Sequence, residues 1–184
     1  MAGVWQFAPN RETAGGSSWL LETPSVLLLI DAPPLTEANQ AFLEQKNLVR
    51  KPVEQGAPSG GQEPDPTGWM LFTGRAGHGR ARQWQRRLGW PVLVQEQEAY
   101  LLPGLERLAS FGDSHHLAEG VDLLWTPGPS PGSCVVQVRS GMWGNGDVLC
   151  CGRLLVPVGP GRLAPLRTRG TFHWPRLLLS LIHI

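Results

Sequence analysis

Short apolar runs bounded by glycine and proline recur along the chain and predict β-strands. The run Val26–Ile30 is continuously apolar, which is typical of a strand covered on both faces. The other predicted strands are Val4–Phe7, Trp19–Glu22, Trp69–Phe72, Pro91–Val94, Val121–Trp125, Ser133–Val138 and Val148–Cys151, with Leu154–Val158 extending the last of them. The residues around His115 and His116 follow Asp113 and Ser114 and are predicted to form a loop.

Three segments between these runs have the spacing of helices. The first begins after Thr36, an N-cap residue type, and the second is Arg80–Leu88, which Gly89 ends. The third, Gln95–Leu102, carries Glu96 and Glu98 in its first turn; this placement suits the helix dipole, and an acid/base pair is the alternative. Strands with interspersed helices predict a layered α/β or α+β domain.

Composition favours a globular core in a single domain spanning residues 1–184. Apolar residues make up 41% and charged residues 17% of the chain, and no apolar run approaches the roughly 18 residues that would span a bilayer. Glycine and proline number 23 and 17, so turns are frequent. The stretch Lys51–Gly68 is rich in Pro, Gly and Gln and is predicted to form an exposed, mobile loop, at about residues 51–68.

Net charge and cysteine content limit the partners and the cellular compartment that we expect for the protein. A net charge of +1 gives the whole chain no drive toward nucleic acid or an anionic membrane, so we expect neither as a partner. The three cysteines, two of them adjacent, form no disulfide or zinc framework, which favours a reduced, cytoplasmic protein. The sequence leaves the oligomeric state open.

Five short segments, taken in order, resemble one family. They are the strand ending in Asp31, the strand with Thr73 and its glycine-rich loop, the strand and helix of Val92–Leu102, the loop Thr126-Pro127-Gly128-Pro129-Ser130-Pro131-Gly132-Ser133, and Gly152-Arg153-Leu154. The fourth is the most specific, because it resembles the Thr-Pro-Gly-His-Thr-Pro-Gly-Ser segment of metallo-β-lactamase-fold hydrolases. The fifth resembles the Gly-Asp-x-Leu segment that follows in that family.

The resemblance implies a four-layer αβ/βα sandwich of the α+β class, in which two sheets pack face to face with helices outside. It also implies loops at one sheet edge that, in catalytic members, hold one or two zinc or iron ions through a His-x-His-x-Asp-His loop and later His and Asp ligands. Such ions activate a bound water and polarise the bond to be hydrolysed.

The sequence departs from that family at every ligand position that the resemblance places. With Thr73 as the anchor, those positions hold Gly74, Ala76, His78, Gly79, Pro129 and Arg153. Glycine, alanine and proline side chains carry no donor atom, and an arginine repels a cation. One imidazole does not make a zinc site, so we expect the fold without the metal and predict no cofactor.

The same loops are predicted to form a candidate pocket for a small anion. Its residues are Asp31, Arg75, His78, Arg153 and His173. Guanidinium groups bind a carboxylate or phosphate through charge-assisted hydrogen bonds, and the glycine-rich loop adds backbone N–H donors. In the alternative interpretation, the arginines are solvated or pair with Asp31, Glu96 or Glu98.

Three functions remain open on the sequence. The first is a non-catalytic or small-anion-binding protein that has lost its metal centre. The second is an active metal-dependent hydrolase of a thioester, lactone or phosphoester, with an unusual site built from His78, Asp31 and His173. The third is an interaction module that uses the 51–68 loop and the arginine face of the second helix, whose members are Arg80, Arg82, Arg86 and Arg87.

The carboxyl-terminal residues have an unusual sequence. Residues Ser180–Ile184 resemble a translated sequencing adapter. We therefore expect these last residues to be non-native and the domain to be truncated at its carboxyl end.

Overall fold

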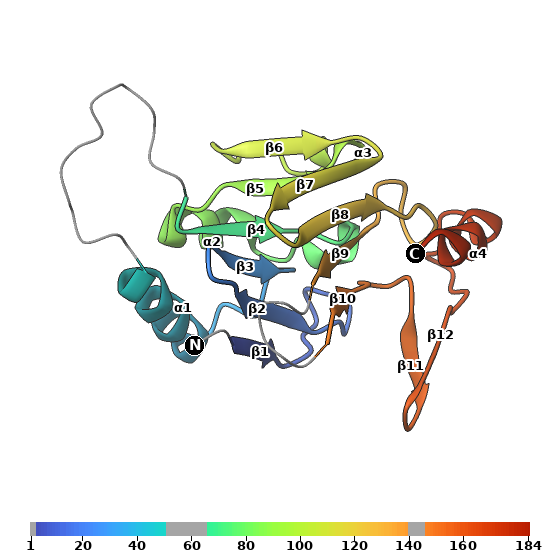
Figure 1. Ribbon diagram of the computed structural model, residues 1–184, viewed down its shortest axis with the longest axis horizontal. Helices are drawn as coiled ribbons and strands as arrows, with labels where there is room; N and C mark the ends of the chain where they lie inside the picture. Colours follow the sequence, from blue (N-terminus) through green and yellow to red (C-terminus); the bar gives the residue numbers. More distant parts are fainter. Residues whose placement is uncertain (1–2, 51–65, 140–145) are drawn as a thin grey trace.

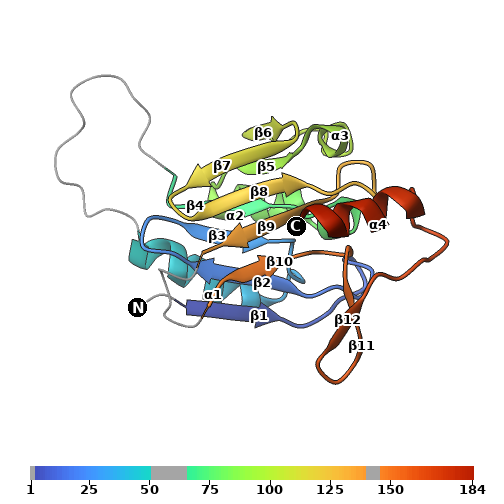
Figure 2. The same ribbon diagram turned by 45° about the vertical axis from the view of Figure 1, so that its right-hand side comes forward.

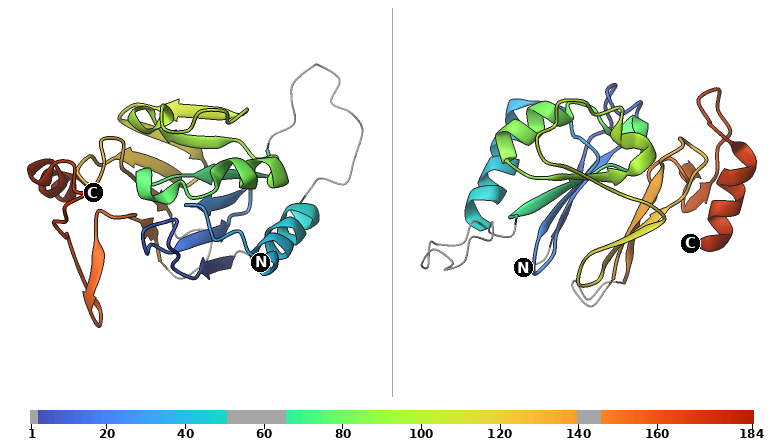
Figure 3. Two further views of the ribbon diagram at one scale, coloured as in Figure 1. Left: turned by 180° about the vertical axis from the view of Figure 1, so that it is seen from behind. Right: turned by 90° about the horizontal axis from the view of Figure 1, so that it is seen from above.

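Two β-sheets lie face to face in the computed structural model, which describes residues 3–50, 66–139 and 146–184 (Figure 1). Helices cover the outer face of each sheet, so that the layers run helix, sheet, sheet, helix (Figure 3, right). The predicted four-layer αβ/βα sandwich is therefore confirmed. The loop predicted at 51–68 lies outside the described residues except for 66–68, and Gly68 already belongs to a strand.

The first sheet has six strands in sequence order. They are β1 (Gly3–Phe7), β2 (Ser18–Glu22), β3 (Leu27–Ile30), β4 (Gly68–Leu71), β5 (Val92–Gln95) and β6 (Leu108–Phe111). Strands β1 to β3 pair antiparallel, whereas β3 to β6 pair parallel. The carboxyl ends of β3, β4 and β5 therefore meet at one edge of the sheet.

The second sheet has four antiparallel strands in the order β10-β9-β8-β7. They are β7 (Ser114–Ala118), β8 (Val121–Trp125), β9 (Cys134–Val138) and β10 (Val148–Cys150). Strands β11 (Val156–Gly159) and β12 (Arg162–Ala164) pair only with each other, as a two-stranded ribbon that extends away from the sandwich (Figure 1).

Four α-helices complete the layers. Helices α1 (Glu37–Arg50) and α2 (Ala81–Leu88) cover the outer face of the first sheet, and α4 (Trp174–His183) covers the second (Figure 3). The short α3 (Glu96–Ala99) follows β5 directly. Gly89 ends α2 in the left-handed conformation, with a φ of 69°, as the sequence predicts.

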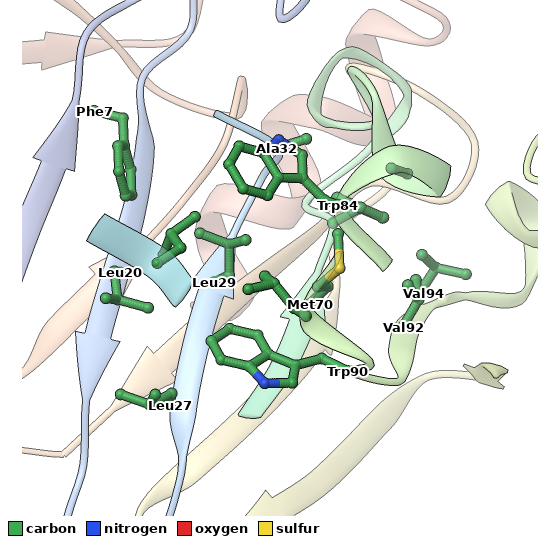
Figure 4. Packing of buried hydrophobic residues seen from close by; sticks show 14 of the residues in the cluster. Phe7, Leu20, Leu27, Leu29, Ala32, Met70, Trp84, Trp90, Val92 and Val94 are labelled. Carbon is green, nitrogen blue, oxygen red and sulfur yellow. The ribbon is translucent and has the colours of Figure 1, made fainter. Parts of the chain in front are cut away.

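The alternation of side chains along β3 explains why the whole strand is apolar. Leu27 and Leu29 point toward the helices and pack in a cluster that includes Trp84 of α2 (Figure 4). Leu28 and Ile30 point the other way, into the space between the two sheets. Because successive side chains of a strand point to opposite faces, a strand with a layer on each side needs apolar residues at every position.

Two buried indoles are held by hydrogen bonds that also join the helices to the loops. Trp84 Nε1 donates to the Pro33 carbonyl at 2.8 Å, and Trp90 Nε1 donates to Asn47 Oδ1 at 2.9 Å. Asn47 in turn donates from Nδ2 to the Leu88 carbonyl at 3.1 Å, so α1 and α2 share one buried polar link. Buried polar groups are stable only when paired in this way.

Two predicted elements were wrong. His115 and His116 lie in β7 and not in a loop, because Ser114–Ala118 pairs with β8. Leu154 does not extend β10: it is buried against α4, and the next strand begins only at Val156. None of the helices in the described ranges is long and apolar enough to cross a membrane.

The space between the sheets should be the most sensitive part of the core. We expect Leu28→Ala to lower the free energy of unfolding by about 2–5 kcal/mol, because it leaves a cavity between two layers that cannot close independently. Val49→Ala, at a side chain that is 80% exposed on α1, should change it by less than about 0.5 kcal/mol. Urea denaturation measures both values, and equal effects would contradict the layered packing.

Candidate functional site

Loops from both sheets converge at the edge where β3, β4 and β5 end. Asp31 follows β3, Thr73 follows β4, and the loop of residues 126–133 joins β8 to β9. The backbone N–H of Cys134 donates to the Thr73 carbonyl at 2.9 Å, which links the two sheets. Gly152, after β10, lies so close that a Cβ there would be 2.4 Å from Thr73 Oγ1. The predicted segments therefore meet at one rim.

Asp31 binds the turn that follows β4. Its Oδ1 accepts from the Thr73 backbone N–H at 2.9 Å, and its Oδ2 accepts from Thr73 Oγ1 at 2.8 Å. The residue has a φ of 58°, a left-handed conformation that aspartate tolerates better than most residues. Gly77 packs directly on the carboxylate, since a Cβ there would be 1.9 Å from Oδ1. Burial raises the pKa of Asp31 to about 6, although the two bonds from Thr73 lower it.

Glu98 is fully buried beneath the loop of residues 126–133. Its Oε1 accepts from Ser130 Oγ at 2.5 Å and from the Gly132 backbone N–H at 3.2 Å. Ser130 Oγ is also 2.8 Å from Ser133 Oγ. Gly132 is required for this approach, because a Cβ would be 2.5 Å from Glu98 Cγ. The carboxylate thus ties α3 to the loop, a role that the sequence interpretation as a helix-dipole residue missed.

His78 lies against Glu98 without a hydrogen bond to it. His78 Nε2 is 3.8 Å from Glu98 Oε2, and both atoms are buried with no hydrogen-bond partner among the described residues. The imidazole packs on Phe72, with ring centroids 5.4 Å apart. Burial, and then the charge of Arg75, lower the pKa of His78 to about 4, so the ring is neutral at pH 7.

Two of the ligand positions implied by the resemblance have no room for a side chain. A Cβ on Gly74 would be 2.9 Å from Ser133 Oγ and 3.0 Å from Ser130 Oγ, and one on Gly79 would be 3.0 Å from Ala32 Cβ. Gly79 also has a φ of 42°, which a larger residue would adopt only with strain. The serines of the loop therefore occupy the space beside Gly74.

The remaining ligand positions carry no cluster of donors either. Ala76 sits in the single 3₁₀ turn Arg75–Gly77, and the Pro129 carbonyl accepts from the Phe172 N–H at 3.3 Å. The Arg153 guanidinium donates to the Ala14 carbonyl at 3.0 Å.

The five residues of the predicted anion pocket contact different partners. Asp31 lies against Gly77, the neighbour of His78, and both of these polar side chains are largely buried. Arg75 instead donates to Tyr100 Oη at 3.4 Å, while Arg153 contacts the β1–β2 loop as described above. His173 begins α4, where its Nδ1 accepts from the Arg176 N–H at 3.2 Å. A common anion pocket stays a prediction.

The alternative interpretation predicted that the arginines pair with Asp31, Glu96 or Glu98. In the described parts of the chain there is no ion pair of that kind. On the arginine face of α2, Arg80 pairs with Glu12 at 2.6 Å and Arg87 with Glu44 at 2.7 Å. These exposed pairs contribute little stability and leave part of the face solvated.

A zinc or iron centre requires three or four donors around one point. Within residues 3–50, 66–139 and 146–184, no group of three or more His, Cys, Asp or Glu side chains could hold a metal ion. At the rim, His78 Nε2 and Glu98 Oε2 lie 3.8 Å apart, and both oxygens of Asp31 accept hydrogen bonds from Thr73. The residues at the rim therefore do not fit the metal centre that the resemblance implies.

The raised pKa of Asp31 makes the stability of the protein depend on pH. The folded value of about 6 exceeds the ordinary 3.8, so this group's contribution is fully present below pH 3.8 and is lost as the pH rises through about 6. The loss amounts to about 3 kcal/mol. Asp31→Asn has no such titration, so its free energy of unfolding relative to the unmodified protein should rise between pH 4 and pH 7. Urea denaturation across that range measures the difference, and a flat difference would contradict the assignment.

Sequence comparisons and structure comparisons give different results for this chain. No family model matches it, and no curated protein matches its sequence. Solved structures of the metallo-β-lactamase superfamily do match. The B3 metallo-β-lactamase BLEG-1 aligns with a TM-score of 0.60 and 17% identity, covering 98% of this chain and 84% of that one.

Two further structures extend the likeness. An archaeal metallo-β-lactamase superfamily protein from Sulfolobus tokodaii aligns with a TM-score of 0.60 and 12% identity, over 100% of this chain and 75% of that one. An N-acyl homoserine lactone hydrolase, with its product bound at the catalytic metal centre, aligns with a TM-score of 0.55 and 18% identity, over 91% and 74%. At these identities the likeness concerns the fold, and the chain has the metallo-β-lactamase fold.

Proposed function

We propose that this protein is a non-catalytic member of the metallo-β-lactamase fold, whose former metal rim is closed by a buried hydrogen-bond network. The observation that carries the proposal is a chain of contacts: Ser130 donates to Glu98 and bonds Ser133, and both serine hydroxyls lie in the space beside Gly74. The network occupies the space that the first ligand side chain of the family's loop would need. A binding or scaffolding role then remains for the fold.

The chemistry of the rim supports this proposal. Metal-assisted hydrolysis needs an ion that lowers the pKa of a bound water, and the side chains here supply too few donors to hold one. The alternative hydrolase site would use His78, Asp31 and His173. Asp31 already accepts two hydrogen bonds from Thr73, and His173 caps α4 at the surface. Neither residue is free to act on a substrate beside His78.

Small-anion binding receives less support than a purely non-catalytic role. The deep part of the rim contains two buried carboxyl groups, Asp31 and Glu98; burial first, and then the charges of these two groups, raise the pKa of the nearby Cys134 thiol. This local acidity opposes an anion. Among the residues that the structure describes, the exposed Arg75 guanidinium offers a positive charge beside His78. We therefore keep anion binding as the second form of the proposal.

The absence of a metal requirement is directly measurable. Purified protein, incubated with zinc and then freed of unbound ion, should retain far less than one equivalent per chain, because no three donors converge on one point. It should also fail to hydrolyse a β-lactam or an acyl homoserine lactone in a chelator-sensitive way. A B3 metallo-β-lactamase treated in parallel is the positive control. One tightly bound zinc per chain, lost together with turnover, would refute the proposal.

Restoring the first ligand tests whether the network closes the rim. We expect Gly74→His to lower the free energy of unfolding by about 1–3 kcal/mol, because its side chain collides with Ser130 and Ser133. Ala76→His, at a half-buried position, is the matched control and should cost less than about 1 kcal/mol. Urea denaturation gives both values, and zinc titration should show no gain for either. A stable Gly74→His variant that binds zinc together with His78 would show that the rim is open.

A further inference from the structure

Charge is distributed very unevenly along this chain. Residues 148–184 contain five arginines and no aspartate or glutamate, so the first 147 residues carry the total of +1 less this +5, which is −4. The five are Arg153, Arg162, Arg167, Arg169 and Arg176. The net charge of the whole chain hides this separation, and a local field depends on where charges lie and not on their sum.

Three of these arginines lie on the segment of residues 156–172, which we call the basic ribbon. It consists of β11, β12 and the loop that leads toward α4, and it projects from the sandwich in two views (Figures 1 and 2). Arg162, Arg167 and Arg169 are exposed and make no ion pair or hydrogen bond with the described part of the chain. Their charges are available to a partner.

Large apolar side chains alternate with those arginines on the basic ribbon. Val158 is 52% and Leu163 is 61% exposed, and the following loop exposes Leu166 and Phe172 by 51% and 54%. Leu163 lies opposite Pro157 in the β-pairing, on the other face of the ribbon from the pair Val156 and Ala164. A two-stranded hairpin is marginally stable in water, so exposed apolar groups on it indicate a surface that a partner covers.

The backbone of the basic ribbon is a poor site for adding a strand. Pro157 lies within β11, and Pro165 directly follows the three residues of β12. Proline has no N–H to donate, and short edges with proline are typical of strands that resist further pairing. An extended peptide would therefore gain few backbone hydrogen bonds here.

We propose that the basic ribbon docks the protein on an anionic lipid membrane. Guanidinium groups of Arg162, Arg167 and Arg169 bind the lipid phosphates, while Val158 and Leu163 enter the headgroup region beside the Gly-Pro-Gly tip of the hairpin. The rest of the chain, with its net negative charge, is repelled by the same surface. This polarity orients the molecule with the ribbon toward the lipid.

The shape of the ribbon favours lipid over a protein partner. A flat protein surface covers one face of a two-stranded ribbon and leaves the other in water, whereas headgroups surround an inserted tip on all sides. A second copy could offer its acidic body to the ribbon, but that head-to-tail contact repeats without closing and leads to filaments. Neither alternative covers the apolar groups on both faces.

The primary test is co-sedimentation of the full chain with vesicles. Equimolar phosphatidylcholine and phosphatidylglycerol should retain the protein, and phosphatidylcholine alone should not. Added salt should weaken the retention, because screening reduces the attraction between arginine and phosphate. Equal retention on both vesicles, or none on either, would overturn the proposal. Retention on polyglutamate in place of vesicles would also overturn it and indicate an acidic protein partner.

Matched variants locate the contact on the molecule. Arg162→Gln with Arg167→Gln should weaken vesicle binding about 25-fold, since each arginine near such a surface contributes about fivefold. Arg82→Gln with Arg86→Gln, on α2, changes the net charge equally and should leave binding within about twofold. If the α2 pair weakens binding as much as the ribbon pair, the effect is one of total charge and the proposal fails.

A separate variant tests how much the apolar side chains of the basic ribbon contribute to vesicle binding. Val158→Ser with Leu163→Ser keeps every charge and should weaken binding to anionic vesicles at least about tenfold, because the tip no longer enters the headgroup region. Both side chains are exposed and belong to none of the core clusters, so circular dichroism and urea denaturation should give the values of the unmodified protein. Unchanged binding of this folded variant would overturn the insertion of the tip.

Discussion

A carboxylate buried without a cation determines how the rim of this fold is built. Glu98 has no solvent contact, and a buried charge or carboxyl group is stable only if donors surround it. Ser130 and the Gly132 N–H supply those donors, so the loop of residues 126–133 folds down onto α3. The same serine then lies beside Gly74. In a catalytic rim a metal ion would organise these loops, whereas here hydrogen bonds to one carboxylate do so.

The two buried carboxyl groups, Asp31 and Glu98, bind different loops of the rim. Asp31 binds Thr73 through both oxygens and fixes the turn after β4, which sets the positions of Gly74 and Gly77. Glu98 fixes the opposite loop. His78 lies beside Glu98 as a neutral ring packed on Phe72, and its Nε2 has no hydrogen-bond partner among the described residues. Asp31 and Glu98 thus hold two different loops of the rim in place.

Local apolar patterns predicted eight of the strands, and the family resemblance predicted the rim, whereas the short strands β6, β7, β11 and β12 were not predicted. The apolar run ending in Asp31 and the Thr-Pro-Gly loop are visible as consecutive residues. The inward orientation of Glu98 was not predictable, since α3 has only four residues and a helical period cannot be read from one turn. The pairing of His115 and His116 in β7 also escaped, because their partners on β8 become apparent only in the folded sheet. Summed charge likewise concealed the arginines of the ribbon.

The core between the sheets and the rim depend on different residues of the chain. The layers depend on residues such as Leu28, Ile30 and Val136, which belong to the buried cluster between the sheets. Substitutions at the rim therefore leave unchanged the stabilisation that comes from burying apolar surface between the sheets. At the rim, Ser130 and the Gly132 N–H satisfy Glu98 Oε1, whereas Glu98 Oε2 and His78 Nε2 have no hydrogen-bond partner among the described residues. Packing therefore restricts which residues can stand between the sheets, and hydrogen bonding to Glu98 restricts which residues can stand at the rim.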